Sequence, residues 1–167
     1  MACENLSDIR CSIGRAMCLV GESWSILILR DLTQGLSHYD EFRKSLGISP
    51  SMLSKRLNEL TEACLIKKTL YQDNPPRYAY SLTEKGEDFL PVIATLLAFG
   101  NKHASPDGID TQMMHVDTHQ RIDPIVVDER TGVPLQLKDI VFGGGPANSE
   151  KKIATLKRRN LPLTASG

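Results

Sequence analysis

The sequence predicts an α+β fold, in which a series of short helices is followed by one β-hairpin and a last helix. Apolar residues recur at helical spacing from residue 9 to residue 60. From residue 66 the period falls to about two residues, and the Pro75-Pro76 pair separates two β-rich runs. The helical period returns over residues 84–103. Together these two changes of period define the expected fold class.

The composition fits one ordinary globular domain with an appendage. The chain has 167 residues, 41% of them hydrophobic, and its 20 basic residues balance 20 acidic ones. Its four cysteines show no CxxC spacing, so we expect neither a disulfide framework nor a metal site, and no cofactor. No apolar run reaches the roughly 20 residues that span a bilayer, and the N-terminus lacks the basic flank of a signal peptide. We therefore expect a cytoplasmic protein with no membrane partner.

Three helices are expected in the first part of the chain. The first covers residues 9–20. The second begins at a Ser23 cap and is apolar nearly all round, which is typical of a helix at the centre of a small domain. The third covers residues 39–46, with Ser37 at its start and Asp40 at the third position of a capping-box-like arrangement.

The fourth helix is the one around which the chain is organised. Ser49 suits an N-cap, and Pro50 fits the first helical position, where its missing N–H costs nothing. Three leucines recur on one face at helical spacing, while the opposite face is short-chained, basic and hydrogen-bonding. Such a face suits the base edges and phosphates of a major groove. Because a tight turn at residues 47–48 joins it to the third helix, we expect a helix-turn-helix with this as its recognition helix.

Residues 66–71 and 77–82 are expected to pair as a β-hairpin around the loop of residues 72–76. A hairpin at this place would be the wing of a winged helix-turn-helix. Between residues 43 and 80 seven basic residues stand against three acidic ones, so positive charge is concentrated there although the whole chain is neutral. The residues expected to contact DNA are Arg43, Ser49, Ser51, Met52, Ser54, Lys55, Arg56, Asn58, Lys67, Lys68, Asn74 and Arg77.

Two of these expectations carry alternatives. Arg56 lies close to the leucine stripe, so it could brace the helix instead of touching DNA. Lys67 and Lys68 fall on alternate faces of the hairpin and cannot both point at one groove.

Thr83 is expected to cap a long last helix, whose residues 89–100 are too apolar to have only one buried side. A domain of this size cannot cover them all, and an exposed patch of that kind usually marks an interface. We therefore expect a homodimer formed through residues 9–20 and 84–103, with a kink at Pro91.

These motifs resemble those of HxlR-type winged helix-turn-helix transcriptional regulators, which are relatives of the MarR group. The resemblance implies a DNA-binding regulator, and we expect a dimeric repressor on a pseudo-palindromic operator. Two positions depart from the family pattern: Cys64 stands where the family usually has glycine, and Phe99 where it usually has tryptophan. A left-handed backbone at position 64 would be strained by a non-glycine residue. The motifs form one collinear series over residues 9–103, made of Cys11, Arg15, residues 21–32, Phe42, residues 48–57, residues 75–83 and Gly86.

Two mechanisms compete for the release of such a repressor by an effector: cysteine oxidation, and a small ligand held between the dimer helices and the DNA-binding body. HxlR-type thiol-stress sensors carry a cysteine at the place of Cys11, which makes it the redox-sensing candidate. The alternative is a small apolar residue at a helix interface, because cysteine is often buried. Reactivity would require access and a lowered thiol pKa, to which Arg10 or Arg15 could contribute.

A small β appendage is expected at residues 105–146, after the domain of residues 1–104. Some HxlR-type proteins carry a zinc-ribbon-like knuckle in such an extension, but Asp128 and Thr131 occupy the cysteine positions here, so no metal is expected. Residues 147–167 are expected to be a basic tail, either a short helix or disordered. The strands of the appendage are expected at residues 122–127, 134–137 and 140–142, around a turn at residues 128–132.

Two other classes of function compete with a DNA-binding regulator. An enzyme is not expected, because the sequence has no phosphate loop, nucleophile elbow or paired catalytic carboxylates. A winged helix used for protein association without DNA binding is the second alternative. The local excess of positive charge on the helix and the wing argues against it.

Overall fold

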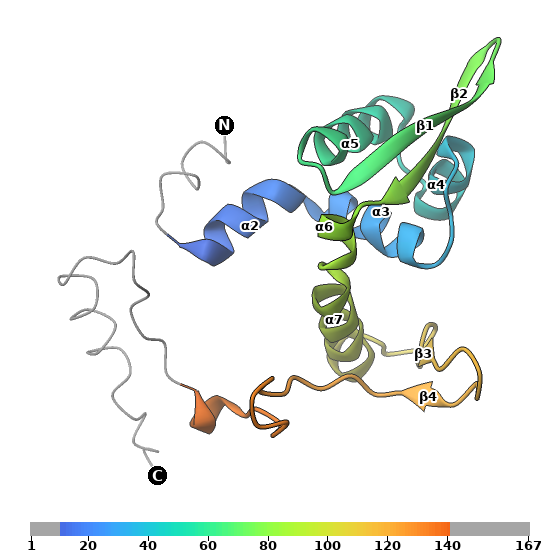
Figure 1. Ribbon diagram of the computed structural model, residues 1–167. Helices are drawn as coiled ribbons and strands as arrows, with labels where there is room; N and C mark the ends of the chain where they lie inside the picture. Colours follow the sequence, from blue (N-terminus) through green and yellow to red (C-terminus); the bar gives the residue numbers. More distant parts are fainter. Residues whose placement is uncertain (1–10, 141–167) are drawn as a thin grey trace. The chain divides into compact units, whose positions relative to one another are not determined.

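The structure, a computed structural model, describes residues 11–140. The chain divides into two units, of which the first ends at Asp123 and the second begins at Pro124. The first unit combines short helices with a small antiparallel sheet, which confirms the predicted α+β class (Figure 1). From the sequence, the boundary between the main domain and the appendage was expected between residues 104 and 105. The expectations for residues 1–10 and for the basic tail lie outside the described residues.

Helix α3 (Ser23–Thr33) lies at the centre of the first unit, as its apolar sequence predicted. It packs against α4 (Tyr39–Leu46), α5 (Pro50–Glu62), α7 (Leu90–His103) and the second strand of the hairpin. Its Ile28 and Leu29 are fully buried, and so are Phe42 of α4 and Leu53 of α5. The remaining helix before it is α2 (Ser12–Val20), in which only Val20 is buried.

Two of the predicted helix caps lie one residue away from their observed places. Glu22, not Ser23, is the N-cap of α3, and its side chain makes no capping hydrogen bond. His38 is the N-cap of α4, and Glu41 completes the capping box in place of Asp40. The Glu41 carboxylate reaches the preceding turn because its Oε2 accepts hydrogen bonds from the backbone N–H groups of Ser37 and His38, both at 2.8 Å.

The turn between α4 and α5 is as tight as the sequence predicted. Gly47 adopts a left-handed conformation at φ 62° and ends α4, and the buried Ile48 then anchors the turn in the core. Ser49 caps α5 by accepting a hydrogen bond from the backbone N–H of Met52. The predicted leucine stripe of α5 is buried: Leu53, Leu57 and Leu60 are each at most 1% exposed.

Strands β1 (Ile66–Asp73) and β2 (Pro76–Leu82) form the expected antiparallel hairpin, with Ile66 opposite Leu82. The strands run closer to the turn than predicted, and a register shift between Leu70 and Gln72 interrupts their pairing. The hairpin extends beyond α4 and α5 (Figure 1). Its base is fixed to the segment before α4, where the Tyr80 N–H donates to the Ser37 carbonyl at 2.7 Å.

The junction between α5 and β1 shows that Cys64 stands at a left-handed position, with φ 56°. It is the residue after the C-cap of a Schellman motif, in which Leu65 N–H bonds the Leu60 carbonyl and Cys64 N–H bonds the Thr61 carbonyl, both at 3.0 Å. A non-glycine residue is strained in this conformation, as the sequence analysis anticipated.

The last helical segment is broken into two helices, not one continuous helix with a kink. Thr83 caps the four-residue α6 (Glu84–Glu87), and α7 begins after Phe89 with Pro91 in its first turn. The break follows from Pro91, which has no N–H to donate to the carbonyl of residue 87. A side chain at Gly86 would place Cβ 2.1 Å from the Leu65 carbonyl oxygen, so α6 can approach the junction only with glycine there.

The residues after α7 differ from the expected β appendage. Strands β3 (Met113–Met114) and β4 (Arg121–Ile122) form a short hairpin that the sequence did not indicate and that still belongs to the first unit. Of the predicted strands at residues 122–127 and 134–137, the structure has only Ile122 in β4 and an isolated bridge between Val127 and Pro134, and of the third, at residues 140–142, it describes only Ile140. The second unit otherwise holds the 3₁₀ turn Leu137–Asp139. Its many exposed apolar side chains give it too little core for a sheet.

The expected turn at residues 128–132 is present. The Gly132 N–H donates to the Asp128 carbonyl at 2.7 Å, and the Thr131 hydroxyl donates to the Asp128 carboxylate at 2.9 Å. Asp128 and Thr131, which stand at the expected cysteine positions, are therefore hydrogen-bonded to each other.

Among the helices of residues 11–140, none is by itself long and apolar enough to cross a membrane. The bent pair of α2 and α3, taken together, has the length and composition of a membrane span, and these two properties are all that it shares with one.

Candidate nucleic-acid interface

The face of α5 opposite its buried leucines is polar and exposed. Ser51, Ser54, Lys55 and Asn58 all lie on it, and Met52 is half-buried at its edge. Within the described residues the Asn58 amide makes no hydrogen bond, so both its donor and its acceptor are available. An amide of this kind can form the bidentate pair that reads adenine in a major groove. The structure thus places four of the predicted contact residues together.

Tyr39 of α4 also reaches this face, and the sequence analysis missed it. Its hydroxyl donates to the Pro50 carbonyl at 2.9 Å and lies 3.3 Å from the Ser54 hydroxyl. The contact fixes the first turn of α5 against α4, and it gives Ser54 a partner inside the protein. The signal available in the sequence was weak: a tyrosine at the start of the third helix has an O–H group that requires a partner when it is packed.

Arg56 does not belong to the exposed face, and its assignment as a DNA contact is corrected. The residue is only 4% exposed. Its Nη2 lies 2.5 Å from Glu22 Oε2, and its Nη1 lies 2.6 Å from Glu59 Oε2. The guanidinium therefore braces α5 against the start of α3, which was the alternative that its place beside the leucine stripe had suggested.

Lys55 is the basic side chain on α5 that remains accessible. It is 61% exposed, and its Nζ lies 4.0 Å from Glu59 Oε1, which is a loose surface ion pair. Such a pair leaves the ammonium group free to move to a phosphate. Arg43 on α4 is exposed as well.

The wing carries the other predicted basic contacts. Lys67, Lys68 and Arg77 are all exposed, and the Lys68 ammonium lies over the Tyr78 ring, 3.8 Å from its centre. Lys67 and Lys68 are consecutive in β1, and that only one of them can face a given groove stays a prediction. Asn74 lies at the exposed turn, where the Gln72 side chain donates to its carbonyl at 3.2 Å.

Aromatic side chains connect the wing to the helices. The His38 and Tyr71 rings meet edge to face, with 4.9 Å between their centres, and Phe42 and Tyr80 make a similar contact at 6.2 Å. Burial raises the pKa of the Tyr80 phenol, and the neighbouring Tyr39 and Tyr78 add to the shift. The orientation of the wing relative to α4 is thereby set by packed rings.

Cys11, the redox-sensing candidate, lies at the N-cap of α2 and is half-buried. Its carbonyl accepts a hydrogen bond from the backbone N–H of Arg15 at 3.0 Å. The cysteine lies at the start of a helix whose apolar residues Ile13 and Met17 are largely exposed.

Comparison with known proteins agrees with this geometry. The family model for the HxlR-like helix-turn-helix matches residues 19–108. The uncharacterized HTH-type transcriptional regulator Rv3095 of Mycobacterium tuberculosis is 32% identical over 141 residues, which cover 84% of this chain and 89% of Rv3095.

Two solved structures are also similar. A candidate transcription factor of Pseudomonas aeruginosa, PA1374, is 39% identical, with a TM-score of 0.60 over 87% of this chain and 99% of that one. The redox regulator HypR in its oxidized form is 26% identical, with a TM-score of 0.52 over 56% of this chain and 97% of HypR.

Proposed function

Since this chain belongs to the HxlR-like helix-turn-helix family and is a transcriptional regulator of that type, we propose that it acts as a repressor that binds operator DNA as a homodimer. The operator would be pseudo-palindromic, because two copies of one recognition helix related by a two-fold axis read the same half-site twice. The half-sites would be about one duplex turn, ~34–36 Å, apart.

The observation that carries the proposal is the exposed polar face of α5 beside a basic wing. Ser51, Lys55 and Asn58 offer groups that match base edges and phosphates, and Lys67 and Arg77 extend positive charge along the hairpin. The leucines on the other side of α5 fix its direction, so these groups are presented on a rigid element. A helix used only for protein association would have no need of this charge.

Support for a homodimer comes from the exposed apolar residues of α7 and α2. On α7, Val92 and Phe99 are 42% and 64% exposed, and on α2 Ile13 is 68% exposed. Apolar side chains of this size gathered on two helices are typical of an interface.

The release mechanism has two candidates. Oxidation of Cys11 is supported by the resemblance of its position to that of thiol-stress sensors and by the similarity of the chain to the redox regulator HypR. A small ligand that binds within the regulator is the other. Either must favour one of two separations of the recognition helices, because an effector without differential affinity shifts no equilibrium. Operator release by hydrogen peroxide, compared between the wild type and Cys11→Ser, distinguishes them: an unchanged response in the variant removes Cys11 as the sensor.

The function is tested by measuring duplex binding over a range of salt concentrations. Operator sequences selected from a random duplex library should be pseudo-palindromic, and the logarithm of their affinity should fall linearly with the logarithm of the salt concentration. A protein association module would select no common sequence and would bind no duplex even at low salt.

A further inference from the structure

We propose that a cavity between α3 and α7 binds a small, uncharged, largely apolar molecule, and that this molecule is the effector. The effector role rests on the proposed function, whereas the binding site itself does not. The cavity lies entirely within the first unit of the chain. Its volume of about 560 Å³ is in the range of pockets that hold drug-sized molecules.

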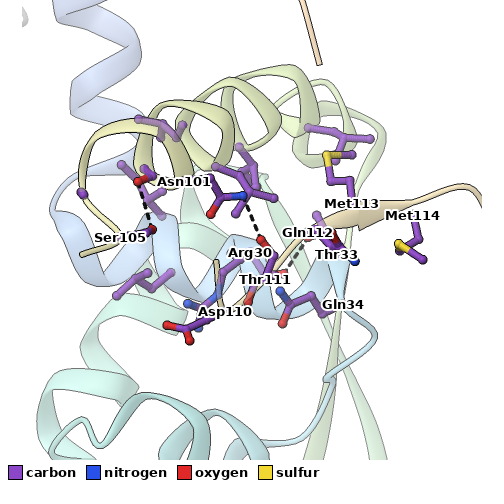
Figure 2. A pocket seen from close by; sticks show the side chains of 18 residues that line it. Arg30, Thr33, Gln34, Asn101, Ser105, Asp110, Thr111, Gln112, Met113 and Met114 are labelled. Carbon is purple, nitrogen blue, oxygen red and sulfur yellow. Dashed lines mark hydrogen bonds between the residues drawn. The ribbon is translucent and has the colours of Figure 1, made fainter. Parts of the chain in front are cut away.

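Three segments line the cavity (Figure 2). Ile26, Leu27 and Arg30 line it from α3, and Ile93, Leu97 and Gly100 are among the residues that line it from α7. The third side is formed by residues 110–114, which follow α7 and lead into β3. This last segment lies outside the helix-turn-helix and its wing, so the recognition machinery does not account for it.

A hydrogen bond holds the third side in place. The Asn101 amide of α7 donates to the Thr111 carbonyl at 2.9 Å, a contact that is drawn in Figure 2. The Met113 side chain, half-buried beside it, also lines the cavity. Because the chain covers this side with its own residues, the space suits a small molecule and not a helix from a partner.

The lining defines the chemistry of the ligand. Arg30 brings a positive charge, but its Nε donates to Asp31 Oδ1 at 3.0 Å and its Nη2 contacts the same oxygen at 2.5 Å, so the charge is already matched. Asp110 adds a negative charge, which disfavours an anion. Gln34 and Gln112 offer amides to a hydroxyl or carbonyl group. The expected ligand is therefore uncharged, with an apolar body and one or two hydrogen-bonding groups.

The cavity and the proposed dimer interface use adjacent faces of α7, which meet at Leu96. The cavity residues Ile93, Leu97 and Gly100 recur at spacings of three and four, which places them along one stripe of the helix. Val92 and Phe99, seven residues apart, lie on the next stripe and are exposed, and Leu96 between them both belongs to that stripe and lines the cavity. A second copy seated on the stripe of Val92 and Phe99 would cover the cavity edge at Leu96 and leave the wall formed by Ile93, Leu97 and Gly100 available to a ligand.

Helix α3 connects the cavity to the DNA-binding surface. Its Ile26 and Leu27 face the cavity, and the next two residues, Ile28 and Leu29, are fully buried in the core that also holds Leu53 of α5. A ligand that fits only one spacing of α3 and α7 would therefore favour one position of α5 relative to the dimer helix. That differential fit is what an effector requires.

The binding site is tested with N-phenyl-1-naphthylamine, an uncharged apolar dye whose fluorescence rises in an apolar site, titrated into the full-length protein. Gly100→Leu fills the cavity. Gly100→Ala is the matched control, because a Cβ at this position meets no atom within 4 Å and both variants gain helix propensity. The wild type and Gly100→Ala should bind the dye saturably and equally, and Gly100→Leu at least tenfold more weakly.

A second variant keeps the test decisive if Gly100→Leu unfolds. Asn101→Ala removes the hydrogen bond to Thr111 without touching the core, and it should weaken dye binding severalfold. No saturable binding by the wild type, or equal binding by the wild type, Gly100→Leu and Asn101→Ala, would overturn the site.

The effector role is tested separately, by measuring operator affinity with and without saturating dye. A change in the wild type and Gly100→Ala that is absent in Gly100→Leu supports the role. Dye binding with unchanged operator affinity contradicts it and leaves the binding site standing. Failure to bind any duplex contradicts the proposed function, and the dye titration still decides on the site.

Discussion

The guanidinium of Arg56 binds the carboxylate of Glu22, with 2.5 Å between Nη2 and Oε2, and so ties α5 to the N-cap of α3. A second bond runs from Nη1 to Glu59 at 2.6 Å. The Arg56 side chain is 5% exposed, whereas Glu22 and Glu59 remain partly in water. This basic residue of α5 is thus part of the protein interior, and its role is to hold the helix in place.

Replacing Arg56 should therefore lower stability. Arg56→Ala removes the ion pair with Glu22, the charge-assisted hydrogen bond to Glu59 and the packing of the side-chain stem, and we expect the free energy of unfolding to fall by about 1–3 kcal/mol. Urea denaturation measures the change. Lys55→Ala, at an exposed position on the same helix, is the matched control and should stay within about 0.5 kcal/mol of the wild type. Equal stability of Arg56→Ala and the wild type would refute the bracing role.

Cys64→Gly should stabilise the protein. The left-handed backbone at φ 56° costs an L-residue about 1–2 kcal/mol, and glycine avoids this cost but loses more entropy on folding. We expect a net gain of about 0.5–1 kcal/mol, measured as a higher melting temperature. Cys64→Ser keeps the Cβ and removes the thiol, so it should bring no gain. A similar gain in both variants would show that the thiol, and not the backbone, is responsible.

The capping box of α4 should make part of the stability depend on pH. Hydrogen bonds from the Ser37 and His38 N–H groups lower the pKa of Glu41 below its ordinary 4.5. A depressed carboxyl pKa stabilises the folded state above the unfolded pKa, and the contribution disappears as the pH falls through the folded pKa. Glu41→Gln should therefore melt at a lower temperature than the wild type at pH 7, and the difference should shrink on acidification below pH 4.5.

Asp40→Asn is the control for this effect. It removes a carboxylate from the same helical turn, but within the described residues Asp40 accepts no capping hydrogen bond. An equal loss in Asp40→Asn and Glu41→Gln would assign the effect to charge at the helix N-terminus.

The dimer interface can be tested at Phe99. A glutamate there would place a charge on the exposed apolar stripe of α7, so Phe99→Glu should be monomeric at micromolar concentration while the wild type is dimeric. Sedimentation velocity measures both. Lys102→Glu, an exposed polar position on the same helix, should remain dimeric. A wild type that sediments as a monomer, or a dimeric Phe99→Glu, would place the interface elsewhere or remove it.

The sequence predicted the helices and the hairpin well because local chemistry determines them. Ser49 and Pro50 fixed the start of α5, and the leucine period fixed its buried face. The left-handed position of Cys64 was also foreseeable, since it follows the helix at the place where a glycine is usual.

Features that depend on tertiary contacts were not predictable in the same way. The position of Arg56 inside the protein depends on Glu22, 34 positions earlier in the chain, and the Tyr39 contact depends on how α4 meets α5. After α7 the β-rich composition suggested strands, but too few apolar side chains are buried there to form a sheet. Up to residue 140, pairing is limited to the two-residue strands Met113–Met114 and Arg121–Ile122 and the bridge between Val127 and Pro134.

The central claim, that α5 reads DNA, is tested most directly by comparing Lys55→Ala and Asn58→Ala with the wild type on the selected operator and all its single-base variants. If Lys55 contacts a phosphate, its variant should bind every sequence more weakly by a similar factor, with the salt slope reduced by about 1. If Asn58 reads a base, its variant should lose about 1–3 kcal/mol of preference at one position in each half-site and keep the rest. Wild-type affinity, salt slope and base preference in both variants would contradict the account.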